Sequence, residues 1–66
     1  MIRHIEVQHR TETGRTTVRH YVNNVLDRTD RSSRTLAEAM VHARDLGRVR
    51  GQEVLFFIDG VEFEVK

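Results

Sequence analysis

Apolar and polar residues alternate with a period of two through the first third of the chain, and this pattern is typical of half-buried β-strands. Val7 lies on an apolar face before the Thr13-Gly14 dipeptide, and Val18 lies on the corresponding face after it. We therefore predict a β-hairpin over residues 2–23. With the turn centred on Thr13-Gly14, a two- or four-residue loop keeps the apolar faces together, whereas a slip of one residue would mix them.

The same turn places two histidines on the inward face of this hairpin. In that register His9 lies opposite Val18. His20 then lies opposite Val7, so the two imidazoles are diagonal neighbours about 7–8 Å apart. Such a pair could share a metal ion, but zinc needs at least a third protein ligand, and the sequence supplies no candidate. We expect the rings to pack at the rim of the sheet with their nitrogens in water, and we predict no metal site.

A helix is predicted over residues 35–50. It begins with a capping box, in which the Thr35 hydroxyl and the Glu38 carboxylate each accept a hydrogen bond from a backbone N–H of the first turn. Apolar residues then recur at helical spacing along one stripe, made of Leu36, Ala39, Met40, Ala43, Leu46 and Val49. We expect Gly51 rather than Gly47 to end the helix, because the stripe continues beyond Gly47.

A second β-hairpin is predicted over residues 52–66, because Asp59-Gly60 between two apolar runs is a strong signal for a two-residue turn. We expect the helix to cover one face of this hairpin. That face pairs Ile58 with Val61, Phe56 with Phe63 and Val54 with Val65. The opposite face pairs Phe57 with Glu62 and Leu55 with Glu64.

Residues 24–34, between the first hairpin and the helix, are polar turn formers around one apolar pair, and we predict a connecting loop there. The chain is thus predicted to be a single α+β domain over residues 1–66 with the element order ββαββ. One helix packs on one face of a four-stranded, mainly antiparallel sheet. Two all-antiparallel strand orders, 2-1-3-4 and 1-2-4-3, satisfy the pattern. The predicted core face of the sheet contains Ile5, Val7, Val18, Val22, Val54, Phe56, Ile58, Val61, Phe63 and Val65.

Length and composition limit the classes of function. A chain of 66 residues buries only about 60% of the surface that its unfolded form exposes, so oligomerisation is a common remedy for its thin core. The sequence has no cysteine, which excludes disulfides and thiolate zinc sites and fits a reducing cytoplasm. No apolar run approaches the roughly 20 residues needed to cross a bilayer. We expect a cytoplasmic protein with no membrane segment and no cofactor.

Nothing in the sequence indicates catalysis, since it has no glycine-rich phosphate loop, no nucleophile elbow and no cysteine. We predict that the protein is not an enzyme, with no catalytic residues and no small-molecule substrate. The strongest functional signal is apolar. Leu55 and Phe57 point away from the helix, on the face expected to be solvated, and Tyr21 shares that face. These three residues are predicted to form a partner interface, in a homodimer or with another protein.

The charge distribution supports a second interpretation. Residues 1–50 carry ten arginines against six acidic residues, whereas residues 51–66 carry four acidic residues against one lysine. This asymmetry could guide either a second copy of the chain or a nucleic acid. The alternative function is therefore a small arginine-rich nucleic-acid-binding or regulatory protein that uses the first hairpin and the 28–34 loop. Its predicted contacts are Arg10, Arg15, Arg19, Arg28, Arg31 and Arg34.

The second half of the chain resembles small bacterial and phage hairpin–helix–hairpin domains. The stretch that carries the resemblance runs from Thr35-Leu36-Ala37-Glu38-Ala39 to Gly51 and continues through Glu53-Val54-Leu55-Phe56-Phe57 and Asp59-Gly60-Val61. Its motifs are structural rather than catalytic. The resemblance implies the predicted fold, but such families have no established activity, so it transfers no site residue and no partner.

Overall fold

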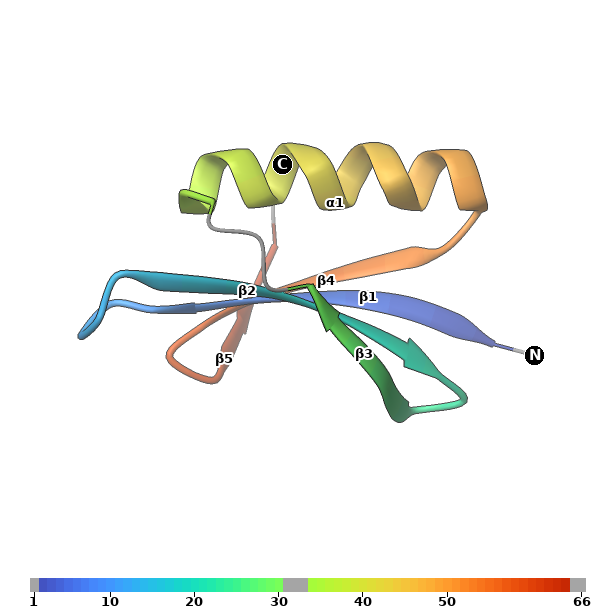
Figure 1. Cartoon of the computed structure of the whole chain (residues 1–66), viewed down its shortest axis with the longest axis horizontal. Helices are drawn as coiled ribbons and strands as arrows, with labels where there is room; N and C mark the ends of the chain where they lie inside the picture. The colour runs from blue at the N-terminus through green and yellow to red at the C-terminus, as the bar shows by residue number, and fades with distance from the viewer. Residues whose placement is uncertain (1, 31–33, 65–66) are drawn as a thin grey trace.

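The computed structural model describes residues 2–30 and 34–64, and within them one helix lies across one face of a five-stranded sheet (Figure 1). The elements in chain order are β1 (Arg3–Arg10), β2 (Arg15–Val22), β3 (Val25–Asp30), α1 (Leu36–Arg50), β4 (Glu53–Ile58) and β5 (Val61–Phe63). The sheet order is β3-β2-β1-β4-β5. Only the central β1–β4 pair is parallel, and the other three pairs are antiparallel. The α+β class and the single covering helix are as predicted.

The prediction of four strands is wrong, because residues 25–30 form the edge strand β3 rather than part of a loop. Asn23 and Asn24 have φ angles of 51° and 66°, the left-handed conformation that a two-residue type I′ turn requires. They bring Val22 opposite Val25, so β2 and β3 form a second tight hairpin. The rest of the predicted loop, residues 31–33, lies outside the described residues.

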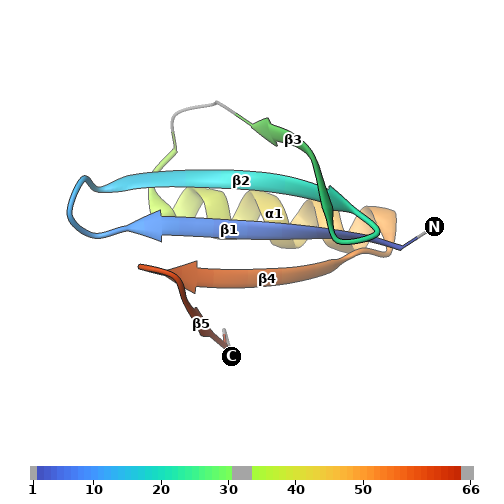
Figure 2. The ribbon, with the colours of Figure 1, turned by 90° about the horizontal axis from the view of Figure 1, so that it is seen from below.

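The extra strand also explains why the all-antiparallel prediction is wrong. Each connection reverses the direction of the chain. With the additional strand β3, β4 runs in the same direction as β1, and β1 and β4 lie side by side as a parallel pair (Figure 2). The order of the four predicted strands, β2-β1-β4-β5, is the first of the two predicted orders.

The first hairpin keeps its predicted faces but not its predicted register. Arg10 pairs with Arg15, which leaves a four-residue loop over residues 11–14, and Val7 lies opposite Val18. Every pair is thus shifted by two residues from the prediction. A shift of two leaves each side chain on its face because the side-chain period of a strand is also two.

This register separates the two histidines that were predicted to be diagonal neighbours. His9 lies opposite Thr16, four residues along β2 from His20, which corresponds to roughly 13 Å at the rise of a strand. The His9 ring is hydrogen-bonded to the Thr16 hydroxyl, with Nδ1 and Oγ1 2.8 Å apart. The diagonal pair on which a shared metal ion would depend is therefore absent.

Both predicted ends of the helix are confirmed. The Thr35 hydroxyl accepts a hydrogen bond from the Glu38 N–H at 3.2 Å, and the Glu38 carboxylate accepts one from the Thr35 N–H at 3.1 Å. Two otherwise unsatisfied amides of the first turn are thus paired. Gly51 ends the helix in the left-handed conformation, with a φ of 65°, which glycine adopts without steric cost.

The core lies between the small residues of α1 and the centre of the sheet. Its buried members are Ile5, Val7, Val18, Ala39, Ala43 and Phe56. The predicted stripe is wrong at Val49, which is 83% exposed, because the buried face of the helix passes through Gly47 instead. The predicted core face of the sheet is wrong at Val61, which is 69% exposed on the edge strand β5.

The β4–β5 hairpin has the predicted register over residues 56–63, but the predicted pair of Leu55 with Glu64 is not formed because β5 ends at Phe63. Phe56 pairs with Phe63, and their rings lie 5.8 Å apart between centroids. On the other face Phe57 pairs with Glu62. The predicted partner of Val54, Val65, lies outside the described residues.

The helix packs against β1, β2 and β4, and the edge strands β3 and β5 flank this covered part of the sheet. A side chain of α1 still approaches β3, since His42 Nε2 lies 3.8 Å from Asp30 Oδ2. This arrangement creates the two features that position candidate sites: a sheet face that no element of the described residues covers, and a cleft between α1 and β3. No helix in the described part of the chain is long and apolar enough to span a membrane.

Candidate functional site

The sheet face opposite α1, seen from the front in Figure 2, carries a row of hydrogen-bonded polar side chains along β1. His4 Nε2 and Glu6 Oε2 are 2.8 Å apart, and Gln8 Nε2 donates to Glu6 Oε1 at 3.0 Å. Alternate residues of a strand share a face, so these three side chains form one continuous row. A polar row in the middle of the sheet is fixed in place by its own bonds.

Two side chains of β2 enclose this row on one side. Tyr21 lies opposite His4 and stacks on it, with ring centroids 4.7 Å apart and an interplanar angle of 5°. Arg19 lies opposite Glu6, and its Nε is buried without a hydrogen-bond partner among the described residues. An unsatisfied buried donor costs roughly 1–3 kcal/mol, which makes Arg19 the position on this face where an added acceptor would contribute most.

The predicted interface residues of β4 border the other side of the polar row. Leu55 lies beside Glu6 and Phe57 beside Gln8, and both are half-buried rather than fully exposed. The structure therefore places Tyr21, Leu55 and Phe57 on one face, as predicted. They do not form one apolar patch, because the polar row of β1 lies between Tyr21 on β2 and the two residues of β4. We call this surface the open face.

The open face also includes a residue that the sequence did not indicate. Leu26 of β3 pairs with Tyr21 and is 48% exposed, so it extends the apolar border on that side. It was missed because β3 was predicted as loop, and a residue of a loop has no assigned face. The Asn23-Asn24 dipeptide was the sequence signal that could have revealed β3, because asparagine tolerates the positive φ angles of a type I′ hairpin turn.

The six arginines predicted to contact nucleic acid do not lie on one surface. Arg10 and Arg15 pair at the exposed tip of the β1–β2 hairpin, whereas Arg19 lies on the open face. Arg34 forms an ion pair with Asp30 at 2.8 Å. Arg28 lines the cleft beside the helix, and Arg31 lies outside the described residues.

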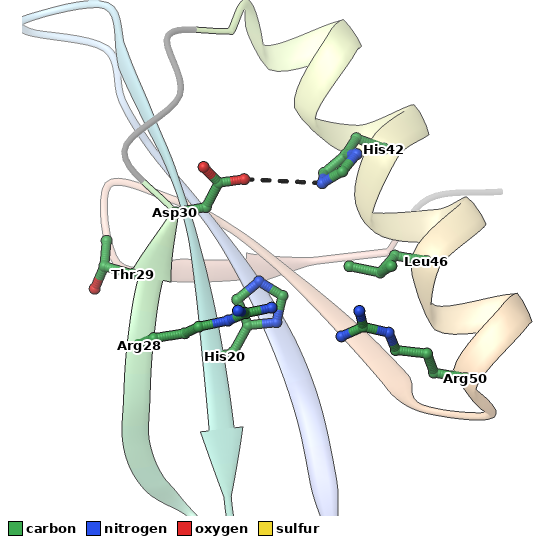
Figure 3. A pocket seen from close by; sticks show the side chains of 7 residues that line it. All are labelled: His20, Arg28, Thr29, Asp30, His42, Leu46 and Arg50. Carbon is green, nitrogen blue, oxygen red and sulfur yellow. Dashed lines mark ion pairs between the residues drawn. The ribbon is translucent and has the colours of Figure 1, made fainter.

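The cleft between α1 and the β2–β3 hairpin has a volume of about 480 Å³. Seven of the described residues line it, and Figure 3 shows that His42, Leu46 and Arg50 of the helix face His20, Arg28 and Asp30 of the two strands, whereas Thr29 points away from the helix. A smaller hollow of about 190 Å³ shares His20, Arg28 and Arg50 with this cleft and is also lined by Arg3.

His20 is the central group of this cleft and is 9% exposed. Burial lowers its pKa below the usual 6.5, and the positive charges of Arg28 and Arg50 lower it further, against a weaker opposing effect of Asp30. The Asp30 carboxylate already pairs with Arg34, and its Oδ2 is 3.8 Å from His42 Nε2. The environment of His20 is thus electropositive, and both burial and this charge favour the neutral form of its imidazole.

No cluster of three or more His, Cys, Asp or Glu side chains that could hold a metal ion occurs among residues 2–30 and 34–64. Comparison of the chain with protein-family models, curated proteins and solved structures finds no match.

Proposed function

We propose that this chain is a small cytoplasmic, non-enzymatic interaction module that forms a homodimer through the open face. The proposal rests on one observation: a helix covers only one side of the sheet, while the other side presents half-buried apolar side chains around a fixed polar row. A mainly antiparallel sheet can leave its second face solvated, but apolar side chains grouped on such a face mark an interaction surface, and a small domain gains most from association. Closed two-fold symmetry is the commonest form of such association.

Charge on the open face favours a second copy of the chain as the partner. Its β2 side carries Arg19, whereas its β4–β5 side carries Glu53 and Glu62. A two-fold axis parallel to β1 turns one copy over so that its β2 side faces the β4–β5 side of the other. Each copy then offers a carboxylate near the unsatisfied Arg19 Nε of its partner, which would remove the cost of that buried donor.

Sedimentation equilibrium of the wild-type chain tests the proposal directly. We expect a mass twice the 7.7 kDa of the chain at about 100 μM, well above the dissociation constants of specific interfaces. Replacing Leu55 and Phe57 together by Gln should give the monomer mass while the helix signal in circular dichroism is retained. The matched control replaces Val41 and Val49, which are exposed on the helix, by Gln and should leave the dimer intact. A wild-type mass near 7.7 kDa would contradict the proposal.

A charge reversal separates this face-to-face dimer from one that forms through the edge of the sheet. Glu62 is exposed on β5, so Glu62→Arg should fold normally and weaken the dimer by about tenfold through repulsion with Arg19 of the partner. Glu12→Arg makes the same charge change at the hairpin tip, away from the open face, and should have no effect. Equal dimerisation of both variants would favour edge pairing through β3 or β5.

Nucleic-acid binding remains the second candidate function, and one observation favours it. Arg10 and Arg15 lie opposite each other at the exposed tip of a two-stranded ribbon, the kind of element that enters a major groove. A mobility shift with random duplex DNA that weakens steeply with salt would support this candidate. The shift should then be lost in Arg10→Gln/Arg15→Gln and kept in Arg44→Gln/Arg48→Gln.

A further inference from the structure

The structure brings two arginines from separate elements to the same imidazole. Arg28 extends from β3 and Arg50 from the last turn of α1, and both reach the part of the cleft that His20 occupies (Figure 3). Neither arginine forms a hydrogen bond or ion pair within residues 2–30 and 34–64. Their guanidinium N–H groups are therefore available to a ligand.

The one acidic side chain among the described residues that line this cleft does not neutralise the two arginines. Asp30 is engaged by Arg34 and lies close to His42, at the other end of the cleft from Arg50. In the adjoining hollow, Asp27 is the one acid that residues 2–30 and 34–64 place beside Arg3, Arg28 and Arg50. Positive charge therefore exceeds negative charge along this side of the helix, even with both histidines neutral.

We infer that the cleft binds a phosphate dianion, either free or as the terminal group of a small phosphorylated molecule, between Arg28, Arg50 and His20. Guanidinium groups match the geometry of phosphate oxygens and bind them through two parallel hydrogen bonds. The volume of about 480 Å³ lies within the range of small-molecule sites and exceeds what the phosphate group alone fills. Leu46 supplies an apolar wall for the remainder of the molecule.

A bound dianion has a specific consequence for His20. The two arginines now lower the pKa of this imidazole, and a neighbouring negative charge acts in the opposite direction. The imidazolium that forms then adds another hydrogen-bond donor to the phosphate. Ligand binding and protonation of His20 thus reinforce each other.

The test is an NMR titration of the four histidines in the full chain, with inorganic phosphate against chloride at equal ionic strength. We expect phosphate to raise the pKa of His20, with a smaller effect on His42, which lines the same cleft. His4 on the open face and His9 near the hairpin tip serve as internal controls and should not respond. Equal responses of all four histidines, or no response of His20, would overturn the inference.

Two variants establish which groups hold the anion. Arg28→Gln and Arg50→Gln should each weaken phosphate binding by about tenfold, because each removes a charge-assisted pair of hydrogen bonds. The matched control is Arg48→Gln, which removes the same charge from the same turn of α1 at a residue that does not line the cleft. Amide spectra of the ligand-free variants verify their folds. Unchanged binding in both cleft variants, or equal loss in the control, would contradict the assignment.

The source of the phosphate group is resolved by three probes. Inorganic phosphate and ribose 5-phosphate carry a dianionic group, whereas dimethyl phosphate is a monoanionic diester like those of nucleic acids and lipids. We expect the two dianions to bind at least about tenfold more tightly than the diester, since both arginines are engaged only by the additional charge. Tighter binding of ribose 5-phosphate than of inorganic phosphate would identify a small phosphorylated molecule. Equal binding of the diester would overturn the dianion assignment.

Discussion

The imidazole of His4 lies flat on the phenol ring of Tyr21, its cross-strand neighbour, with centroids 4.7 Å apart. This stack explains how His4 is only 8% exposed on a sheet face that no described element covers. The ring of Tyr21 shields one side of the imidazole, and the Glu6 carboxylate forms a hydrogen bond with the Nε2 atom of His4. The open face is therefore organised before any partner binds, which lowers the entropic cost of association.

The first prediction concerns this stack. Tyr21→Ala should lower the free energy of unfolding by about 2 kcal/mol, because it removes both the ring contact and the apolar area that covers His4. Tyr21→Phe keeps the ring and should stay within about 0.5 kcal/mol of the wild type. Urea unfolding, followed by circular dichroism at a fixed chain concentration, measures both. Equal stability of the Ala and Phe variants would show that the stack does not contribute.

Gly47 provides the second prediction, because it allows α1 to approach the start of β4. A Cβ at this position would lie 2.5 Å from Val54 Cγ2 and 2.9 Å from the Gln52 carbonyl oxygen. Alanine is the better helix former by about 1 kcal/mol, yet Gly47→Ala should destabilise the protein by about 1–3 kcal/mol through overpacking. Thermal unfolding gives the sign of the change.

A second substitution distinguishes overpacking from an effect on the helix itself. Val54→Ala removes the side-chain atom that the new methyl group would meet, but leaves the backbone contact with Gln52. Adding it to Gly47→Ala should therefore cost less than Val54→Ala costs in the wild-type chain. Simple additivity of the two substitutions would contradict the proposed contact.

The third prediction tests the turn that creates β3. Asn24 has a φ of 66°, a conformation that glycine adopts freely and alanine does not. Asn24→Gly should raise the free energy of unfolding by up to about 0.5 kcal/mol, whereas Asn24→Ala should lower it by about 1 kcal/mol. Chemical denaturation of the three proteins gives this order. Asn23 is left in place because its side chain accepts a hydrogen bond from the Ile2 N–H at 3.0 Å.

This turn also marks the limit of what the sequence predicted. Elements with one buried face gave a clear pattern: the capped helix, the faces of β1 and β2, and the register of β4 with β5. β3 is an edge strand whose side chains are mostly exposed on both sides, so no alternation distinguishes it from a loop. Its omission reversed the predicted direction of β4 relative to β1, since direction depends on the number of chain reversals.

The candidate sites also differed in this way: the open face, built from strands with one buried side, was predictable, and the cleft beside β3 was not. The sequence placed Tyr21, Leu55 and Phe57 on one face because their strands have alternating patterns. Every second residue of a strand shares a face, so an error of two residues in register does not change the face of a side chain. The cleft could not be predicted, because Arg28 was assigned to a loop and Arg50 to the end of a helix far along the chain. Only the path of β3 beside α1 brings these two charges together.

The fourth prediction is a pH dependence of stability caused by His20. Burial and the charges of Arg28 and Arg50 lower its pKa in the folded protein below the value of 6.5 that applies when the chain is unfolded. Between these two values the unfolded chain binds more protons than the folded one, so stability rises with pH across that window. The free energy of unfolding should therefore fall as the pH is lowered from 7.5 through 6.5, and level off below the folded pKa.

The effect of His20 is isolated by comparing how steeply the free energy of unfolding changes with pH in the wild type and in a His20 variant, rather than by comparing their stabilities at one pH. His20→Asn removes the titrating group from a site that faces Arg28 and Asp30 on β3 and His42 and Arg50 on α1. Its free energy of unfolding should decrease less between pH 7.5 and 5.5 than that of the wild type, because the variant lacks the imidazole whose pKa the folded protein lowers. Urea unfolding in chloride buffers free of phosphate measures the two slopes. Parallel slopes would show that the folded protein holds His20 at its ordinary pKa, and the electropositive cleft would then lose its electrostatic support.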